Sequence, residues 1–190
     1  MSWVITAAVI TATAAGVSAR GQYVAGKQQE IELKRQAEEE KIAAQARALG
    51  IDFQMRSALQ VSGHARQAPL VILDTLGELQ ATYSVAAVVF CGGSLVPLGG
   101  QNVLEAAAWG KPVLFGPSME DFQAEKELLV ASGGGSEVAD QRDLVAKIRF
   151  YLAHPDAAAQ AGRAGRAMVQ ANTGAARKHA DVILRALKKH

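Results

Sequence analysis

Apolar and polar positions follow a repeating order from about residue 51 onward. Short apolar runs alternate there with stretches that carry helix signals. The runs predict strands at 51–55, 70–73, 87–91, 113–115 and, less strongly, 136–139. The stretches between them predict helices at 75–85, 102–109, 120–131 and 140–153, another from Pro155, and a last one after Gly174 ending in Lys188–Lys189. We therefore expect an α/β fold, a doubly wound Rossmann-like parallel sheet with helices on its faces.

Helix-start signals support this order of elements. Thr75 and Glu78 have the spacing of a capping box, which predicts that a helix begins at this threonine. In doubly wound folds, ligands bind beyond the carboxyl ends of the strands. The loops that follow the predicted strands, after Met55, Leu73, Cys91 and Phe115, are therefore the places to look for a site.

The chain differs in character before residue 60, where it has no proline and is rich in Ala, Gln and Glu. Residues 3–19 carry no charge. A run of this length is marginal for spanning a bilayer, which takes about 20 apolar residues. It allows a membrane anchor or interfacial helix, a buried or partner-docking helix, and a cleaved signal ending at Val17-Ser18-Ala19. The segment is thus a candidate contact with a membrane surface.

Residues Gly21 to Arg47 form a polar stretch with helical charge spacing. Glu30 and Lys34 stand four residues apart and support a solvated helix. A coiled-coil stalk is the alternative, although no heptad pattern is sustained. We accordingly expect an N-terminal helical extension at 1–36 and an incomplete Rossmann-like domain at 37–190.

Composition excludes several classes of protein. The chain has 190 residues, of which 49% are hydrophobic and 20% charged, so it is neither disordered nor a multi-pass membrane protein. Its net charge of +2 and its aromatic content of 5% give no sign of a nucleic-acid partner. The single cysteine, Cys91, allows no internal disulfide and is expected in the core, and the four histidines lack zinc-site spacing. No metal site is expected.

The loop from Gly92 to Asn102 contains the strongest candidate site. Two Gly-Gly pairs flank Pro97 between a strand and a helix. Glycine lets the backbone approach a ligand and turn its N–H groups toward an anion, and a helix start adds free N–H groups. The sequence lacks both the Walker ending and the dinucleotide fingerprint. A phosphate cradle and a long glycine turn both remain open.

Two further features also allow two interpretations. Glu105 lies three residues after Asn102, which suits a capping-box analogue, and it would equally suit a carboxylate that accepts ribose hydroxyls. The loop from Gly116 to Asp121, which carries the polar residues Ser118 and Asp121, is either a turn with a helix cap or a second contact with a ligand.

Four motifs occur in an order that resembles a known family. They are Asp74-Thr-Leu-Gly-Glu-Leu79, Val89-Phe-Cys-Gly-Gly-Ser-Leu-Val-Pro97, Gly99-Gly-Gln-Asn-Val-Leu-Glu-Ala106 and Gly110-Lys-Pro-Val-Leu-Phe-Gly-Pro117. Together they resemble the C-terminal domain of the bacterial 3-deoxy-D-manno-octulosonic acid (Kdo) transferases. Those are membrane-associated glycosyltransferases of the GT-B fold, which move Kdo from CMP-Kdo to a lipid A precursor.

This resemblance implies roles for particular residues. Gly92, Gly93 and Ser94 would shape the nucleotide-sugar pocket. Backbone N–H groups at the other end of the loop would face the CMP phosphate, and these belong to Gly99, Gly100 and Asn102. Glu105 would hold the ribose, and Arg56 would pair with a phosphate or with the sugar carboxylate. The implied donor substrate is CMP-Kdo, without a further cofactor, and the implied location is the cytoplasmic face of the inner membrane.

The chain also departs from the family pattern. Leu98 and Gln101 stand where the family usually has Arg and His, and Ser118 and Asp121 stand where it commonly has His and Asn. The lost cation and the added carboxylate both disfavour an anionic donor.

The resemblance covers only residues 37–190, without an acceptor domain or a residue we would nominate as catalytic base. We therefore expect a partial Kdo transferase, inactive as an isolated chain, whose acceptor domain is a separate chain if one exists. The alternative is a non-enzymatic structural or interaction protein, in which a helical front resembling small phage virion proteins joins a transferase remnant. A chimeric gene is a third explanation.

Overall fold

A computed structural model describes residues 21–62 and 65–173. The predicted segment at 3–19 and the predicted last helix lie outside these residues. The helices are α1 Gly21–Ala48, α2 Arg56–Ser62, α3 Leu79–Val85, α4 Leu104–Ala108, α5 Gln123–Ser132, α6 Gln141–Ala153 and α7 Pro155–Asn172, and η1 is a 3-10 turn at Glu120–Phe122. The strands are β1 Phe53–Met55, β2 Leu70–Ile72, β3 Val89–Phe90, β4 Val113–Phe115 and β5 Gly135–Glu137.

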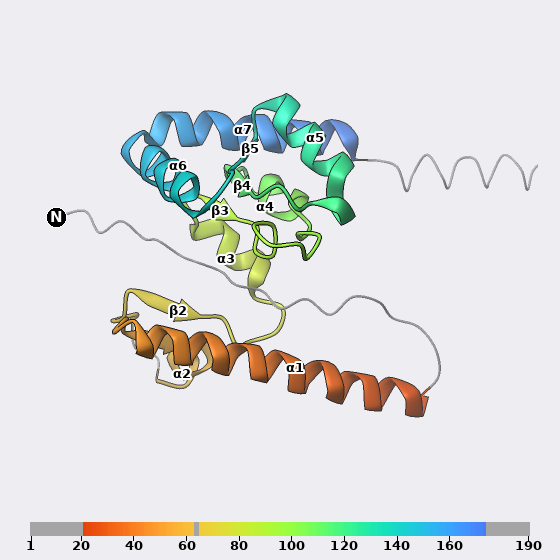
Figure 1. The fold of residues 1–190 in the computed structure, drawn as a ribbon, viewed down its shortest axis with the longest axis vertical. Helices are drawn as coiled ribbons and strands as arrows, with labels where there is room; N and C mark the ends of the chain where they lie inside the picture. Colours follow the sequence, from red (N-terminus) through yellow and green to blue (C-terminus); the bar gives the residue numbers. More distant parts are fainter. Residues whose placement is uncertain (1–20, 63–64, 174–190) are drawn as a thin grey trace, which may run out of the picture.

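All strand pairs in the described part are parallel, which confirms the predicted α/β class. The strands form two sheets: β1 pairs with β2, and β4 lies between β3 and β5. Figure 1 shows α1, α2 and β2 grouped on one side of the molecule and α3–α7 with β3–β5 on the other. The sequence predicted the strands but not this division into two ladders.

The core lies around β4, the central strand of the larger sheet. Its residues Val113, Leu114 and Phe115 are all buried, as a run of apolar residues inside a parallel sheet should be. Met119 and Leu129 are fully buried in the same region. Strands β1 and β3 are only half-buried along their lengths, so the smaller sheet and the edge of the larger one contribute less to the core.

Helix α7 packs on α4 and α5 through glycines. A methyl group added at Gly162 would overlap the carbonyl oxygen of Gly110, and one added at Gly134 would overlap the backbone of Gly165. Backbones approach this closely only where side chains are absent. The glycines of α7 therefore set how near the helix lies to the turns after α4 and α5.

Several element boundaries follow the sequence signals. The Asp140 carboxylate accepts hydrogen bonds from the backbone N–H groups of Arg142 and Asp143, so it caps α6. Gly133 ends α5 with a left-handed φ of 76°. Helix α7 begins at Pro155, as predicted.

The expected start of the helix after β2 is wrong. The Thr75 hydroxyl donates to the Glu78 side chain instead of capping a helix, and α3 begins only at Leu79. The helix expected at 120–131 also differs, because residues Glu120–Phe122 form a 3-10 turn before α5 starts at Gln123. Both turns carry polar side chains that bond within their own loop, and this competes with helix formation.

The polar helix predicted at 21–47 is confirmed as α1, which continues through residue 36 to Ala48. Its last turns carry the buried residues Ala43 and Ala46, and the Arg47 guanidinium lies 5.2 Å from the centre of the Phe53 ring. Within residues 21–62 and 65–173, we find no helix with the length and apolar character required to cross a bilayer.

Candidate functional site

The glycine-rich loop lies at the carboxyl end of β3, where the fold places ligand sites. Gly93, Gly99 and Gly100 have φ values of 74°, 77° and 75°, which L-residues with side chains rarely adopt. The loop therefore depends on glycine at these three positions for its shape. Leu98, which precedes the second Gly-Gly pair, is 71% exposed.

Ser94 links this loop to the loop after β4. Its side chain is fully buried, and its Oγ donates to the Cys91 carbonyl at 2.5 Å and accepts from the Gly116 N–H at 2.7 Å. The Ser94 carbonyl also accepts from the Ser118 N–H at 3.0 Å. Ser94, which was expected to shape the nucleotide-sugar pocket, thus holds the loops after β3 and β4 together. It is not among the residues that line the small pocket beside the loop.

The segment Ser118–Asp121 lies against the second Gly-Gly pair. The Gly99 N–H donates to the Ser118 Oγ at 3.1 Å, and this hydroxyl donates in turn to a Glu120 carboxylate oxygen at 2.7 Å. Neither η1 nor α5 has a side-chain cap bond, so the helix cap that was one interpretation of this loop is not present. The bond from Ser118 holds the pKa of the exposed Glu120 carboxyl below its usual value.

Asn102 and Glu105 stand at the beginning of α4. The Asn102 Oδ1 accepts from the Leu104 N–H at 3.0 Å, and its Nδ2 donates to Glu105 Oε1 at 3.3 Å. The N-cap of α4 is Val103, without a side-chain cap bond, so the predicted capping-box analogue with Asn102 as N-cap is wrong. Asn102 and Glu105 instead contact each other through their side chains just before and within the first turn. Asn102 is exposed and Glu105 half-exposed, so both also remain accessible to a ligand.

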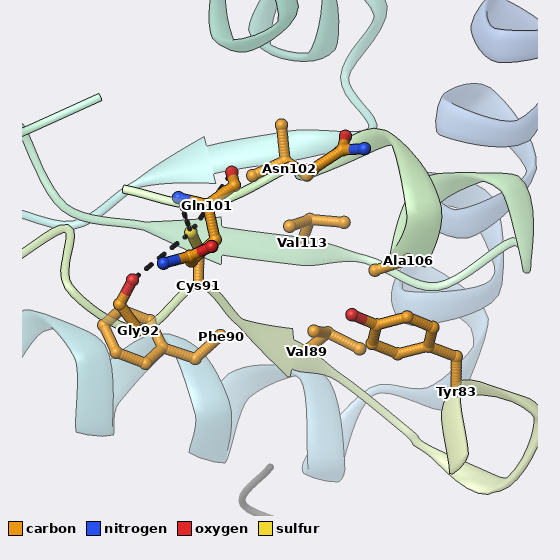
Figure 2. A pocket seen from close by; sticks show the side chains of 10 residues that line it. Tyr83, Val89, Phe90, Cys91, Gly92, Gln101, Asn102, Ala106 and Val113 are labelled. Atoms are coloured by element: carbon orange, nitrogen blue, oxygen red, sulfur yellow. Dashed lines mark hydrogen bonds between the residues drawn. The ribbon is translucent and has the colours of Figure 1, made fainter. Parts of the chain in front are cut away.

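A small pocket lies between β3, β4 and the beginning of α4. Its volume is about 30 Å³, room for only a water molecule or two, and a nucleotide does not fit into it as it stands. Figure 2 shows the Tyr83 ring beside Val89 and Ala106, and the Cys91 thiol at the other end of the pocket. The lining consists of Tyr83, Val89, Phe90, Cys91, Gly92, Gln101, Asn102, Val103, Ala106 and Val113.

Tyr83 contributes the phenol of this pocket, and the sequence analysis did not single it out. Burial, followed by the negative charge of the Glu105 carboxylate, raises the pKa of Tyr83 to about 12. Only its place in a helix just before the buried strand could have pointed to it.

Cys91 is buried, as expected for a core residue. Its Sγ accepts from the Gln101 N–H at 3.1 Å and so joins the two ends of the glycine-rich loop. Burial raises the pKa of this thiol, so it is not a nucleophile poised for reaction at neutral pH. Figure 2 shows the thiol between Gly92 and Gln101.

Arg56 is the first residue of α2, directly after strand β1 of the smaller sheet. Its guanidinium forms an ion pair with Glu78 at 2.8 Å. The neighbouring Ser57 donates through its backbone N–H and its hydroxyl to the two Asp74 carboxylate oxygens, at 2.8 and 2.5 Å. The loops after β1 and β2 are therefore tied together, and Arg56 already has an anionic partner within the chain.

The structure brings together seven of the eight predicted site residues on one loop and the beginning of α4, while Arg56 stands apart from them at the start of α2, directly after β1 of the other sheet. In the part of the chain that the structure describes, no group of three or more histidine, cysteine or acidic side chains is arranged to hold a metal ion. His154, the one histidine described, is exposed and stacks on Phe150.

Comparison with known families and proteins places this site in context. A family described as glycosyl transferase-like matches residues 100–183, which include Gly100, the second member of the Gly99–Gly100 pair, and α4. A 3-deoxy-D-manno-octulosonic acid transferase from Bordetella pertussis is 35% identical over 144 residues, which cover 74% of this chain and 33% of that protein. The transferase of the same name from Aquifex aeolicus is 36% identical over 83 residues, covering 44% of this chain and 24% of that protein.

A solved structure agrees with these sequence similarities. The crystal structure of the C-terminal CMP-Kdo binding domain of WaaA from Acinetobacter baumannii superposes with a TM-score of 0.63 and 25% identity, covering 70% of this chain and 68% of that one. The chain thus spans about a third of the Bordetella pertussis relative but two thirds of this single domain.

Proposed function

Because the chain is a homologue of the 3-deoxy-D-manno-octulosonic acid transferases and corresponds to their C-terminal domain, we propose that it binds a CMP-sugar as the donor-binding half of such an enzyme. The observation that carries this proposal is the glycine-rich loop at the carboxyl end of β3, followed by Asn102 and Glu105, which lie within the residues that the family matches. The matches reported above favour this interpretation and give no support to the structural-protein alternative.

The binding mode follows from the site. Ribose hydroxyls would donate to the half-exposed Glu105 carboxylate, which Asn102 orients. The cytosine would enter beside Tyr83 only if the small pocket widened, because its present volume of about 30 Å³ is too small. Gly92 and Gly93 would allow close approach of the sugar. We expect the affinity for CMP and CMP-Kdo to be low, since Arg56 is engaged by Glu78 and an arginine is replaced by Leu98.

Replacing Glu105 by alanine tests this mode. Calorimetry with CMP should show saturable binding to the unchanged chain and binding at least tenfold weaker to Glu105→Ala, because a hydrogen bond to a charged group contributes about 1.5–3 kcal/mol. Glu125→Ala, which removes a half-exposed carboxylate from the first turn of α5, serves as the control and should bind normally. Equal affinity in the two variants, or no binding at millimolar CMP, would count against the proposal.

We further propose that this chain alone transfers no Kdo. An inverting transfer needs a base that deprotonates the acceptor hydroxyl, and we assign no described residue to that role. Incubation of the purified chain with labelled CMP-Kdo and a lipid A precursor should leave the label on the donor. The positive control is the same incubation with an acceptor-domain chain added, if one exists as a partner, and there the label should move to the lipid A precursor. Transfer by the isolated chain would refute this proposal.

The location is proposed from the same relationship. A Kdo transferase uses a lipid acceptor, which suggests the cytoplasmic face of the inner membrane, with residues 3–19 as the contact with the membrane surface. Fractionation of cells that express the chain with and without residues 3–19 would test this. The shorter form should leave the membrane fraction, and an unchanged distribution would contradict a role for the segment.

A further inference from the structure

The side of the Gly99–Gly100 turn that faces the loop after β4 is already occupied by the chain itself. The Gly99 N–H is taken by the Ser118 hydroxyl, at 3.1 Å. A Cβ placed on Gly99 would lie only 2.5 Å from the Asp121 Oδ2, so a carboxylate oxygen rests directly on this glycine. The turn therefore holds, from within the chain, the kind of oxygen atoms that an anionic ligand would offer.

The charges nearest to the Gly99–Gly100 turn are mainly negative. Asp121 and Glu120 are both exposed acids of η1, and Ser118 holds the Glu120 carboxylate in its charged form near the turn. The nearby cation Lys126 forms an ion pair with Glu137 at 2.6 Å, and its Nζ also donates to the Pro117 carbonyl at 3.4 Å. A phosphate that approached Gly99 would meet two carboxylates before it met an uncommitted cation among these groups.

We propose that Asp121 is a specificity-determining residue, whose carboxylate takes the place of a ligand phosphate at Gly99 and selects against the anionic part of a nucleotide. The proposal rests on the proposed CMP-sugar function and refines it. The uncharged nucleoside part of the ligand then supplies most of the binding energy, while the phosphate adds little or opposes binding. Asparagine at this position would keep the size and polarity of the side chain and remove its charge.

The test compares two full-length variants with the unchanged chain. Asp121→Asn removes the charge at the turn, and Asp156→Asn removes an exposed charge from the first turn of α7, so the net charge changes equally. Calorimetry at low salt should show about fivefold tighter binding of CMP by Asp121→Asn, with cytidine affinity unchanged within twofold. Asp156→Asn should bind both like the unchanged chain. An equal gain in the two variants, or an equal gain for cytidine and CMP, would overturn the proposal.

A second measurement separates this inference from the proposed function. Inorganic pyrophosphate is titrated into isotopically labelled protein while the amide signals of Gly99 and Gly100 are followed by NMR. A saturable shift in Asp121→Asn that is absent from the unchanged chain and from Asp156→Asn supports the role of Asp121, even if neither CMP nor cytidine binds and the proposed function fails. The same response in all three proteins, or in none of them, refutes it.

Discussion

Replacing Gly162 by alanine is expected to lower the free energy of unfolding by about 3 kcal/mol. Intrinsic propensity gives the opposite expectation, because alanine in a helix is favoured over glycine by about 1 kcal/mol. Packing decides the sign: the added methyl group would overlap the Gly110 carbonyl oxygen, which is backbone and has no rotamer with which to move away. Helix α7 would have to lift from the turn after α4.

Gly165 provides the matched control on the same helix. A methyl group there would meet the Gly134 Cα at 3.4 Å and the side chains of Ala107 and Leu129 at 3.5 Å, at the close end of ordinary van der Waals contact. Gly165→Ala is therefore expected to be neutral or stabilising by up to about 1 kcal/mol. Urea denaturation of both variants measures the difference, and equal stability of the two would show that α7 does not depend on this close approach.

Replacing Ser94 by alanine should have the second-largest effect, a loss of about 3 kcal/mol in the free energy of unfolding. The buried hydroxyl serves the Cys91 carbonyl and the Gly116 N–H, and both would lose a hydrogen-bond partner in a site closed to water. These two groups belong to the loops after β3 and β4. We therefore also expect weaker CMP binding, because the glycine-rich loop would lose the hydrogen bond that joins it to the loop after β4.

Ser84→Ala is the control for this substitution. The Ser84 hydroxyl also donates to a backbone carbonyl, that of Ala81 at 2.6 Å, but it is exposed, so water can replace the bond. Its loss should change the free energy of unfolding by less than about 0.5 kcal/mol. Thermal melting followed by circular dichroism compares the pair. Equal melting temperatures would mean that the buried bonds of Ser94 contribute no more than exposed ones.

The parts of the fold that were predictable are those set by neighbouring residues. Strand β4 was predicted with its bounds, because three apolar residues follow directly after Pro112. The starts of α6 and α7 were readable from Asp140 and Pro155, which act on the first turn of their own helices. In each case the residue that marks the start of a strand or helix lies within about four residues of the backbone whose conformation it determines.

The parts that could not be predicted depend on contacts between distant residues. The partner of Arg56 is Glu78, 22 positions away, and nothing local distinguishes an arginine that will meet a carboxylate of its own chain from one awaiting a ligand. Ser118 bonds to Gly99 across 19 positions, and nothing within its own loop points to that partner. The sequence singled out the glycine-rich loop and the loop that carries Ser118 and Asp121, but not the contact of both residues with Gly99.

The two sheets of the described residues share no strand pairing, and this has a consequence for cooperativity. The β1–β2 ladder and the β3–β5 ladder each have a separate set of backbone bonds, so a local opening of one does not require the other to break. Backbone amides in the half-buried β1 would then exchange with solvent faster than those of β4. A single melting temperature would then average two parts of unequal stability, one around each sheet. The Gly162 and Ser94 substitutions act on the part around the β3–β5 sheet, whose amides exchange more slowly.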